Sequence, residues 1–531
     1  MRVERVVGTE TEYAIATGDG SRANPVALSL ELVRAAADPA RSRIHWDYGR
    51  EDPVNDARTG RLPRAMARPS MLTDSPQAAL INVLAPNGGR IYVDHAHPEY
   101  SSPETTDPFQ ALTYDRAGDL LMAQAAARAG QGGEGHGLRL YKNNVDGKGA
   151  CWGTHENYLM DRSVPFARVA ALMTIHFVTR QIFTGSGRVG LGSEGRGSGY
   201  QIGQRADYLQ SRIGLQTTFD RPIINTRDES HSTASTRRFH VIAGDANRMD
   251  LPQVLKVGTT SMLLALLEDA ETAGFDLDAL LGRLAMDDPV AAVRVVSRDL
   301  SLKEPLALES GRRESALEIQ YDLLEGVCQA GAALYGRDGE GQPAWPGEAT
   351  GRVMELWRGA LEDLDQVRGA DADGRMGMTA QAGRLEWLLK WQLLEGLRRR
   401  RSIRDWADPR LAALDIEWAR LDPGHDLPSR LATRIQSAVS PEAVEAATDQ
   451  APAGTRAWFR SRLLHDCPEV IRSMSWSRVV LADPDGDEGQ ALDMDLTDPT
   501  GHTEADCRGL LEHSGNIGRW LLKGEGRDLY C

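Results

Sequence analysis

Residues 88–104 hold the densest group of side chains in the chain that could perform chemistry. The segment opens with a Gly-Gly pair and continues as a β-type run in which Arg90, Tyr92 and Asp94 alternate with apolar residues. Because successive side chains of a strand point to opposite faces, these three polar side chains share one face. Two histidines, two glutamates and a tyrosine follow within ten residues. The pattern predicts an active-site strand, with an ordinary solvated strand face as the alternative.

Two further strands have carboxylates and imidazoles arranged in the same way. Glu10 and Glu12 share a face of the strand expected over residues 3–14, and like charges side by side repel unless a cation lies between them. Oxygen ligands of this kind suit magnesium, with an exposed polar edge as the alternative. A later strand places His155 and Asn157 on one face. A third strand with a polar face favours a ligand role for His155 over that of a buried, hydrogen-bonded histidine.

Arginines near strand ends complete this set of polar groups. A short apolar run delivers Asn225, Arg227 and Glu229 at its end, and the next strand has Arg238 and His240 on one face. A guanidinium group binds phosphate oxygens through two hydrogen bonds, whereas ordinary surface ion pairing is the alternative. Carboxylates, imidazoles and guanidinium groups on neighbouring strands together predict a cleft for a magnesium nucleotide, in which the metal neutralises phosphate charge.

One carboxylate of this set must act on something other than a metal. Asp94 is the best candidate, since Arg90 and Tyr92 flank it on the same face. A carboxylate can serve as a base towards water or an amine, or as a nucleophile on an acyl carbon. The sequence leaves both roles open.

The elements that must position these residues change in type along the chain. Strand patterns dominate the first half, helical apolar spacing dominates from about residue 251 to 402, and a shorter part with strand and turn signals follows. The two carboxylate-bearing strands are separated by a stretch without clean periodicity, over about residues 40–78. A loop of that length is often functional or disordered. We expect it to lie beside the site, because both flanking strands must contribute to it.

Composition and charge exclude several classes of protein. The chain of 531 residues has a net charge of −15, which does not favour binding to the phosphates of nucleic acid. No stretch approaches the roughly 18 apolar residues of a membrane span, and the N-terminus has no signal-peptide pattern. The five cysteines are scattered without C-x-x-C spacing, as in a reduced protein lacking a zinc knuckle. We therefore expect a cytoplasmic protein that binds neither nucleic acid nor membrane.

Several motifs resemble those of the Pup ligase and Pup deamidase/depupylase family. The resemblance extends over most of the chain and is strongest in residues 1–270. The motifs are Gly8–Tyr13 (GTETEY), Tyr92–Tyr100 (YVDHAHPEY), Lys142–Asp146 (KNNVD), His155–Tyr158 (HENY), Gln204–Tyr208 (QRADY) and Asn225–Glu229 (NTRDE). The family implies a glutamine-synthetase-like carboxylate–amine ligase fold of the α+β class, in which a curved antiparallel sheet packed with helices cradles the nucleotide. It implies a catalytic domain over residues 1–435 and a small C-terminal domain over residues 436–531.

Within this family, the deamidase/depupylase branch fits better than the ligase branch. The segment Asp94–His97 resembles that of depupylases, and the stretch at about residues 40–78 lies where depupylases have an active-site loop. The resemblance implies hydrolysis of the isopeptide bond between the C-terminal Glu side chain of Pup, or of a Pup-like modifier, and a substrate lysine. Deamidation of a C-terminal Gln is also implied, as are pupylated proteins as partners and a functional link to the bacterial proteasome. ATP, or ADP plus phosphate, together with Mg²⁺ are the implied cofactors.

The family motifs also assign roles to individual residues. Asp94 is implied to be the catalytic carboxylate, either as nucleophile or as general base. The residues implied to bind the metal are Glu10, Tyr92, Glu99, His155 and His240, and those implied to contact the nucleotide are Arg90, Ser102, Arg227 and Trp476. One departure is the stretch Ser-His-Ser-Thr at residues 230–233, where the family usually has Pro-His-Ala-Asp. It bears on the partner groove and the modifier more than on the chemistry.

Three other interpretations are weighed against this one. A ligase, which forms the same bond with ATP, shares nearly the same site, so the insertion at about residues 40–78 is the discriminating feature. A non-enzymatic scaffold is disfavoured because the carboxylates are intact. A zinc hydrolase that uses His95, His97 and His155 would have three ligands and an open position, but the surrounding arginines and carboxylates favour magnesium and phosphate.

Overall fold

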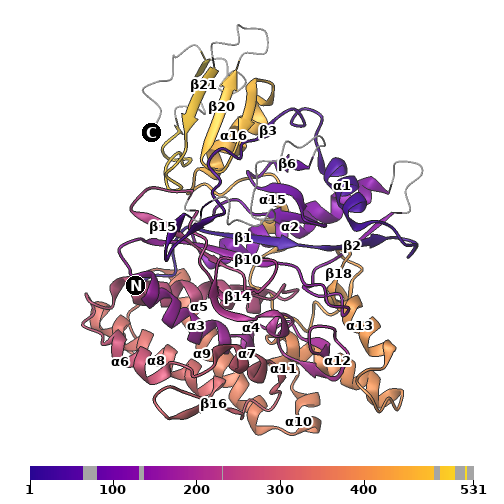
Figure 1. The fold of residues 1–531 in the computed structure, drawn as a ribbon, viewed down its shortest axis with the longest axis vertical. Coiled ribbons are helices and arrows are strands. Elements are labelled where there is room, and N and C mark those ends of the chain that lie inside the picture. Colours follow the sequence, from indigo (N-terminus) through magenta and orange to yellow (C-terminus); the bar gives the residue numbers. More distant parts are fainter. Residues whose placement is uncertain are drawn as a thin grey trace.

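The computed structural model describes residues 1–61, 63, 81–130, 137–229, 231–482, 491–508 and 521–522. Its centre is a six-stranded antiparallel sheet with the strand order β15-β10-β1-β8-β7-β6 (Figure 1). The strands are β1 (Val7–Glu12), β6 (Asn82–Leu84), β7 (Arg90–Asp94), β8 (His97–Ser101), β10 (Thr154–Asp161) and β15 (Thr236–Val241). Helices and an antiparallel sheet confirm the predicted α+β class.

Side-chain alternation along the strands gives the sheet one buried face and one partly exposed, polar face. In β10, Thr154, Glu156, Tyr158 and Met160 are buried and the residues between them are partly exposed. The buried face packs on α2 (Pro108–Ala129) and α5 (Asp250–Asp269). Residues directly opposite each other in antiparallel strands share a face. The pairing register therefore joins the polar faces expected for the single strands into one surface.

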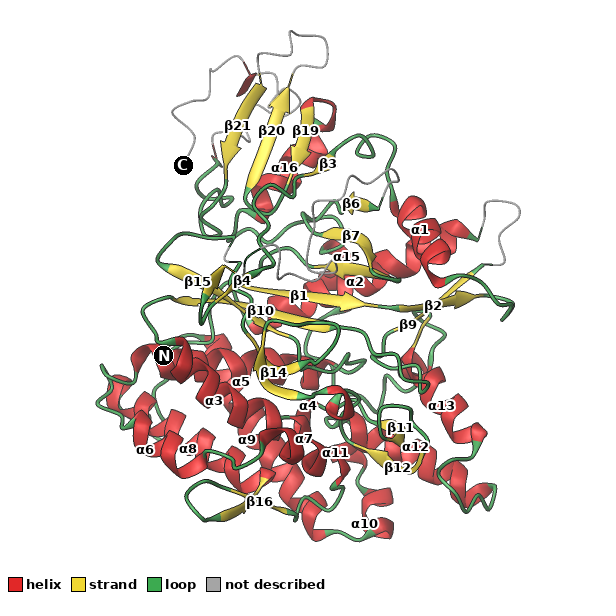
Figure 2. Ribbon diagram, in the orientation of Figure 1, coloured by secondary structure: helices red, strands yellow, loops and turns green. Residues whose placement is uncertain are grey.

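A helical layer lies below the sheet in the view of Figure 2. Two helices outside this layer, α1 (Pro25–Ala36) and α15 (Pro441–Ala446), pack on α2. Together with α5, the layer and its extension comprise α3 (Phe166–Thr179), α4 (Gln181–Thr184), α6 (Leu277–Leu284), α7 (Pro289–Arg298), α8 (Ala316–Tyr335), α9 (Glu348–Gly369), α10 (Ala372–Gly377), α11 (Thr379–Ala382), α12 (Glu386–Arg400), α13 (Pro409–Ala419) and α14 (Leu427–Arg430). It encloses the largest apolar core, in which Trp357 and Trp387 are almost completely buried. The buried face of the central sheet packs against this layer through α5.

Short strand pairs surround the central sheet. One small sheet has the order β18-β9-β2, and β13 pairs with β14 in parallel. The strands are β2 (Ala14–Thr17), β9 (Leu138–Tyr141), β11 (Arg188–Leu191), β12 (Gly197–Gln201), β13 (Ser211–Gly214), β14 (Pro222–Asn225), β16 (Pro305–Ala307), β17 (Arg313–Ser315) and β18 (Arg420–Leu421). The glycine-rich stretch after α4 forms the β11–β12 hairpin. Of these strands, β14 matters most for the site because Arg227 follows two residues after its end.

A second sheet, of order β21-β20-β19-β3, forms the top of the molecule in Figure 1 together with α16 (Ala457–Asp466). Its strands are β3 (His45–Trp46), β19 (Ile471–Met474), β20 (Arg478–Ala482) and β21 (Ala491–Asp495). An apolar cluster of its own lies beneath it and includes Trp458, Met474 and Leu481. Helix α15 packs on α2 and not on this cluster, so the C-terminal residues of the separate core begin near residue 457. The predicted domain boundary at residue 436 stays a prediction.

The segment between β2 and β6 supplies β3 to that second sheet. His45 and Trp46 pair in parallel with Ser473 and Met474, so a segment close to the N-terminus completes a C-terminal sheet. Two further short strands follow, β4 (Asn55–Asp56) and β5 (Gly60–Arg61). The first part of the expected active-site loop is thus ordered into strands, while residue 62 and residues 64–78 lie outside the described residues. Among the helices that the structure describes, none is both long and apolar enough to cross a membrane.

Candidate active site

The polar faces of five neighbouring strands meet on one side of the central sheet. Glu10 of β1 lies opposite His155 of β10, and Glu12 lies opposite Glu99 of β8. Tyr92 of β7 faces Glu99 from the other side. The sequence predicted these faces one strand at a time, and the register brings them together.

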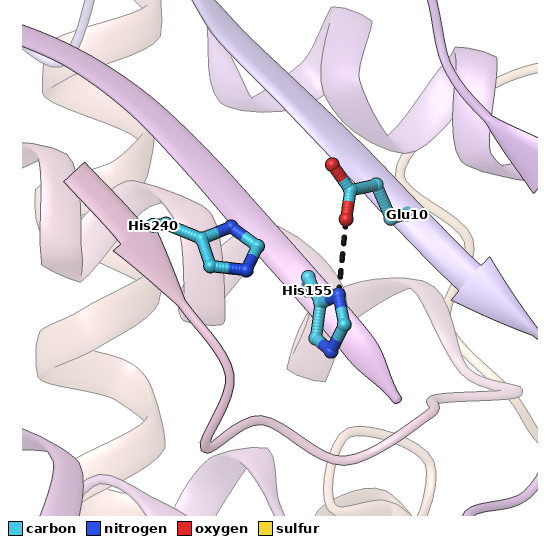
Figure 3. Close-up of side chains that lie close together, drawn as sticks. All are labelled: Glu10, His155 and His240. Atoms are coloured by element: carbon cyan, nitrogen blue, oxygen red, sulfur yellow. Dashed lines mark hydrogen bonds and ion pairs between the residues drawn. The ribbon is translucent and has the colours of Figure 1, made fainter. Parts of the chain in front are cut away.

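Glu10, His155 and His240 form a first group of possible metal ligands, shown in Figure 3. One ligand atom from each residue lies within 4.8 Å of the others. His155 Nδ1 lies 3.0 Å from Glu10 Oε2, and His240 projects from the next strand towards the same space. When His155 Nδ1 donates to this carboxylate, its Nε2 atom remains available as a ligand.

The surroundings of His240 set both its charge and its tautomer. Burial, together with the positive charge of Arg238, holds the pKa of His240 well below its ordinary value, so the ring is neutral. Its Nδ1 atom lies 2.9 Å from Asn157 Oδ1, which also accepts a hydrogen bond from Arg238 Nη1 at 3.0 Å. Because an amide oxygen only accepts, Nδ1 must hold the proton. The lone pair on Nε2 is then free to bind a metal, with Asn157 acting as the orienting partner.

Glu10 is ionised at neutral pH despite its burial. Burial is the largest single influence and raises its pKa, but the hydrogen bond from His155 and the guanidinium charge of Arg238 help to outweigh it, and the pKa is lowered. Asn157 Nδ2 donates to Glu10 Oε1 at 3.0 Å and holds the other oxygen. A charged carboxylate beside two imidazole nitrogens is a preformed donor set for a divalent cation.

Glu12, Asp94 and Glu99 form a second possible group of ligands, again with atoms within 4.8 Å of one another. Burial, together with the negative charges of the neighbouring carboxylates, Asp94 foremost, raises the pKa of Glu99 well above its ordinary value. The Tyr92 hydroxyl donates to Glu99 Oε1. Three carboxylates at this spacing repel one another, and a cation between them removes the repulsion.

The second group fits the magnesium expected from the sequence best, because it offers only carboxylate oxygens, the ligands that magnesium prefers. The first group offers one carboxylate and two imidazoles, a set that suits divalent cations more generally. Among the described residues, neither group spaced for a metal contains His95 or His97. His95 lies against Asp94, and His97 lies against Glu12. The described part of the chain therefore gives no support to a zinc site made from His95, His97 and His155.

Glycine is required where β10 begins, beside both groups of ligands. A Cβ atom on Gly153 would lie 2.3 Å from His155 Nε2 and 2.6 Å from Glu12 Oε1. The Gly153 backbone N–H donates to that same Glu12 oxygen at 2.7 Å. The close approach of backbone to carboxylate is possible only because residue 153 has no side chain.

Asp94 lies at the end of β7, at the edge of this polar face. Burial raises its pKa, but the contact with His95 and the positive charges around it outweigh this effect and lower the pKa, so Asp94 is ionised. The Asp94 side chain is 37% exposed to solvent, whereas the Glu12 side chain is 9% exposed. Asp94 is thus the carboxylate of this group that an incoming molecule reaches most easily.

A cavity of about 80 Å³ lies between Glu10 and the C-terminal sheet. Gly8, Thr9 and Ser102 line it from the central sheet, and Trp476 lines it from the far side. The Ser102 hydroxyl accepts a hydrogen bond from the Thr9 N–H at 2.9 Å, which fixes it at the cavity wall. An indole ring at one end and a metal-binding carboxylate at the other suit a base and a phosphate chain. Ser102 and Trp476 both line this cavity, and their contact with a nucleotide stays a prediction.

Arg90 is held by protein groups rather than by this cavity. Its guanidinium lies between the rings of Trp46 and Tyr92, at 4.1 and 3.9 Å from their centroids. It also donates to Asn82 Oδ1 and to the Tyr48 hydroxyl. The structure does not place it among the residues lining the cavity, so its contact with the nucleotide stays a prediction.

Arg227 emerges from β14 towards the same polar face. Its Nε atom is buried and has no hydrogen-bond partner among the described residues, and its Nη1 atom is 4.0 Å from Glu229 Oε2. A buried donor without an acceptor is costly unless a ligand satisfies it. This orphaned donor fits the phosphate contact expected of Arg227.

Three site residues have no role in the assignment from the family motifs. Glu12 joins the second ligand group, and strand alternation had already paired it with Glu10 as a possible magnesium ligand. Asn157 lies against two of the possible metal ligands, at a position that alternation had also identified. Arg456 lines the cavity and pairs with Glu104, which no pattern near either residue indicates.

The amino-acid sequence is similar to those of known enzymes over nearly its whole length. A family model described as Pup-ligase protein matches residues 5–480. The chain is 40% identical to a depupylase from Acidothermus cellulolyticus over 496 residues, covering 92% of this chain and 93% of that protein. It is 41% identical to a Pup deamidase/depupylase from Mycolicibacterium smegmatis over 487 residues, covering 90% and 91%.

Two solved structures share its fold. The Pup ligase PafA in complex with Pup superposes with a TM-score of 0.74 at 28% identity, covering 99% of this chain and 95% of that one. PafA in complex with ADP gives a TM-score of 0.68 at 30% identity, covering 85% and 92%. The shared fold, together with the extent of the sequence match, shows that this chain belongs to the Pup ligase family.

Proposed function

We propose that the protein is a depupylase and Pup deamidase. It hydrolyses the isopeptide bond between the C-terminal Glu side chain of Pup, or of a Pup-like modifier, and a substrate lysine, and it deamidates a C-terminal Gln. The two relatives compared above bear these names, and both align over at least 90% of the chain. The structural observation that supports the proposal most is Asp94, an accessible ionised carboxylate that belongs to one group of possible cation ligands and lies on the same polar face as the other.

The cofactors that we propose are ATP, or ADP plus phosphate, and Mg²⁺. Nucleotide use is supported by the ADP bound to the ligase PafA and by the cavity between Glu10 and Trp476. Glu10, His155 and His240 would hold one cation, and Glu12 with Glu99 would hold another. When bound, the magnesium nucleotide supplies the positive charge that lets these carboxylates stay ionised close together.

In this proposal, Asp94 carries out hydrolysis of the C–N bond. Hydrolysis adds one water across the C–N bond, so the carbonyl carbon gains the hydroxyl group and the lysine nitrogen gains the proton. As a base, Asp94 takes the proton from the attacking water and returns it to the leaving amine. As a nucleophile, its carboxylate attacks the carbonyl, and the amine leaves with a proton taken from solvent. Water then opens the resulting anhydride, which regenerates the Asp94 carboxylate and returns a proton to solvent.

The two roles differ in where an oxygen from solvent ends up. In a single turnover in H₂¹⁸O, an anhydride opened at the aspartyl carbon leaves labelled oxygen in Asp94. A general base never acquires it. Labelled oxygen in the peptide that contains Asp94, detected by mass spectrometry, would therefore establish the nucleophilic role.

The proposed function is tested by the direction of the reaction. The protein is incubated with ATP, Mg²⁺ and a preformed Pup conjugate, and in parallel with free glutamate-ended Pup and an acceptor protein. We expect release of Pup in the first mixture and no net conjugate in the second. Net conjugation without cleavage would instead identify the protein as a Pup ligase.

A further inference from the structure

His95 occupies a left-handed backbone position that few residues other than glycine adopt. It is the first of two residues, His95 and Ala96, that join β7 to β8, and the flanking Asp94 and His97 form the closing pair of the hairpin. Its φ angle is 52°, in the left-handed region. Residues other than glycine adopt that region at a cost, and asparagine, aspartate and histidine tolerate it best. Such a conformation persists at functional sites when the side chain is needed there.

The His95 side chain has one clear partner, the proposed catalytic carboxylate. Its Nδ1 atom lies 3.0 Å from Asp94 Oδ2, and 47% of the side chain is exposed. The second histidine of the hairpin differs, because the His97 side chain is only 21% exposed and its ring centroid lies 4.9 Å from that of Trp152. Packing against Trp152 accounts for a histidine at position 97. The exposed ring of His95, on a backbone in the left-handed region, has no such packing role.

Asp94 needs such a partner because its side chain is 37% exposed at the end of β7. Glu12 and Glu99 each place a carboxylate oxygen within 4.8 Å of it, but neither can donate a hydrogen bond to it as a carboxylate. A half-exposed carboxylate without a donor can rotate away towards solvent. A donor on the adjacent residue holds one oxygen and fixes the plane of the group, which leaves the other oxygen to react.

We propose that His95 is a positioning residue for hydrolysis, with its Nδ1 donor orienting Asp94 and the left-handed turn directing the ring back onto that carboxylate. The proposal rests on the proposed function, since it concerns the carboxylate that would react. His95 acts through Asp94 in this account and transfers no proton to the substrate.

Two substitutions separate the donor from the backbone. His95→Asn keeps an N–H donor at the same number of bonds from Cβ as Nδ1, and asparagine tolerates the left-handed region. His95→Gly favours the same backbone but has no donor. As a matched control, His425→Asn alters an exposed histidine that lies 3.6 Å from Asp422, away from the site.

Steady-state cleavage of a Pup conjugate is measured for the wild type and the three variants, with ATP and Mg²⁺ present. We expect His95→Gly to lower kcat by about ten- to a hundredfold, the range for a lost hydrogen bond to a charged group, with little change in KM. His95→Asn should recover most of that loss, and His425→Asn should match the wild type. Thermal melting with magnesium nucleotide should be alike in all four proteins.

The outcomes separate the two proposals. If the wild type does not cleave the conjugate, the proposed function fails regardless of His95. If the wild type cleaves and His95→Gly keeps its kcat, His95 is only a turn residue and the inference is wrong. If His95→Asn is as slow as His95→Gly, the ring itself is needed and orientation through this donor is overturned.

Discussion

At the scale of single residues, the carboxylate at the end of β7 decides whether the site can react. Asp94→Asn keeps the shape of the side chain but removes its charge, so we expect the variant to fold and to bind ATP with magnesium while cleavage is lost. Cleavage assays alongside nucleotide binding check this. A loss of less than about tenfold, or roughly 1.4 kcal/mol in the barrier, would remove Asp94 from its catalytic role.

Gly153 tests the close packing between the two groups of ligands. In Gly153→Ala the new Cβ atom would lie 2.3 Å from His155 Nε2, so the imidazole must move. We expect weaker stabilisation by magnesium nucleotide, measured as a smaller rise in melting temperature. Gly282→Ala is the matched control, because a Cβ atom there meets nothing within 4 Å and alanine favours the helix. Equal rises in both variants would contradict the packing argument.

Residue types and spacing were enough to predict much of this site. Alternation along single strands correctly placed Tyr92 with Asp94 and Arg238 with His240, because strand periodicity is local. The sequence could not show that Glu12 meets Asp94, since that depends on the register of three strands. Arg90 shows the limit most clearly: its ring partner Trp46 comes from a segment with no regular pattern.

At the scale of elements, a buried ion pair fastens α16 to the end of β8. Glu104 accepts hydrogen bonds from Arg456 Nε at 2.8 Å and from two atoms of Arg460. Burial raises the pKa of Glu104, but the two guanidinium charges outweigh it and lower the pKa from 4.5 to about 2. The contribution of this pair to stability is therefore complete above pH 4.5 and disappears as the pH falls towards 2.

We expect Glu104→Gln to lower the free energy of unfolding by about 3 kcal/mol at pH 7, because two buried arginines lose their counter-charge. The gap between wild type and variant should shrink as the pH is lowered from 7 to 3, which urea unfolding measures. Asp278→Asn is the control, since its pair with Arg168 is largely exposed and should cost less than about 1 kcal/mol. A gap independent of pH would show that the carboxylate charge is not what holds α16.

At the scale of the whole molecule, the proposed nucleotide would contact both the central sheet and the C-terminal sheet. The cavity takes Glu10 from the central sheet and Trp476 from the C-terminal sheet, so a ligand that spans it should stabilise both. We expect saturating ATP with magnesium to raise the melting temperature, with about 2.7 kcal/mol of stabilisation at 100 times the dissociation constant. No change in melting temperature would mean that the cavity is not a nucleotide site.

The fold class was predictable from the sequence, but this joining of the two sheets was not. Helical spacing between residues 251 and 402 correctly indicated the helical layer, because amphipathic periodicity is strong over long helices. Two-residue strands such as β3 leave no periodic signal. Their pairing is decided only by the tertiary structure.

The parallel pairing of β3 with β19 also sets the order in which the molecule can be built. His45 leaves the ribosome early, yet its partner Ser473 is made near the end of synthesis. Pairings between residues so distant in sequence form late, because the chain between them must first be brought together. The central sheet can assemble while the chain is still growing, but the wall that contains Arg456 and Trp476 cannot. Stalled chains that end before residue 471 should therefore retain no labelled ATP, and the enzyme gains its nucleotide only once translation is almost complete.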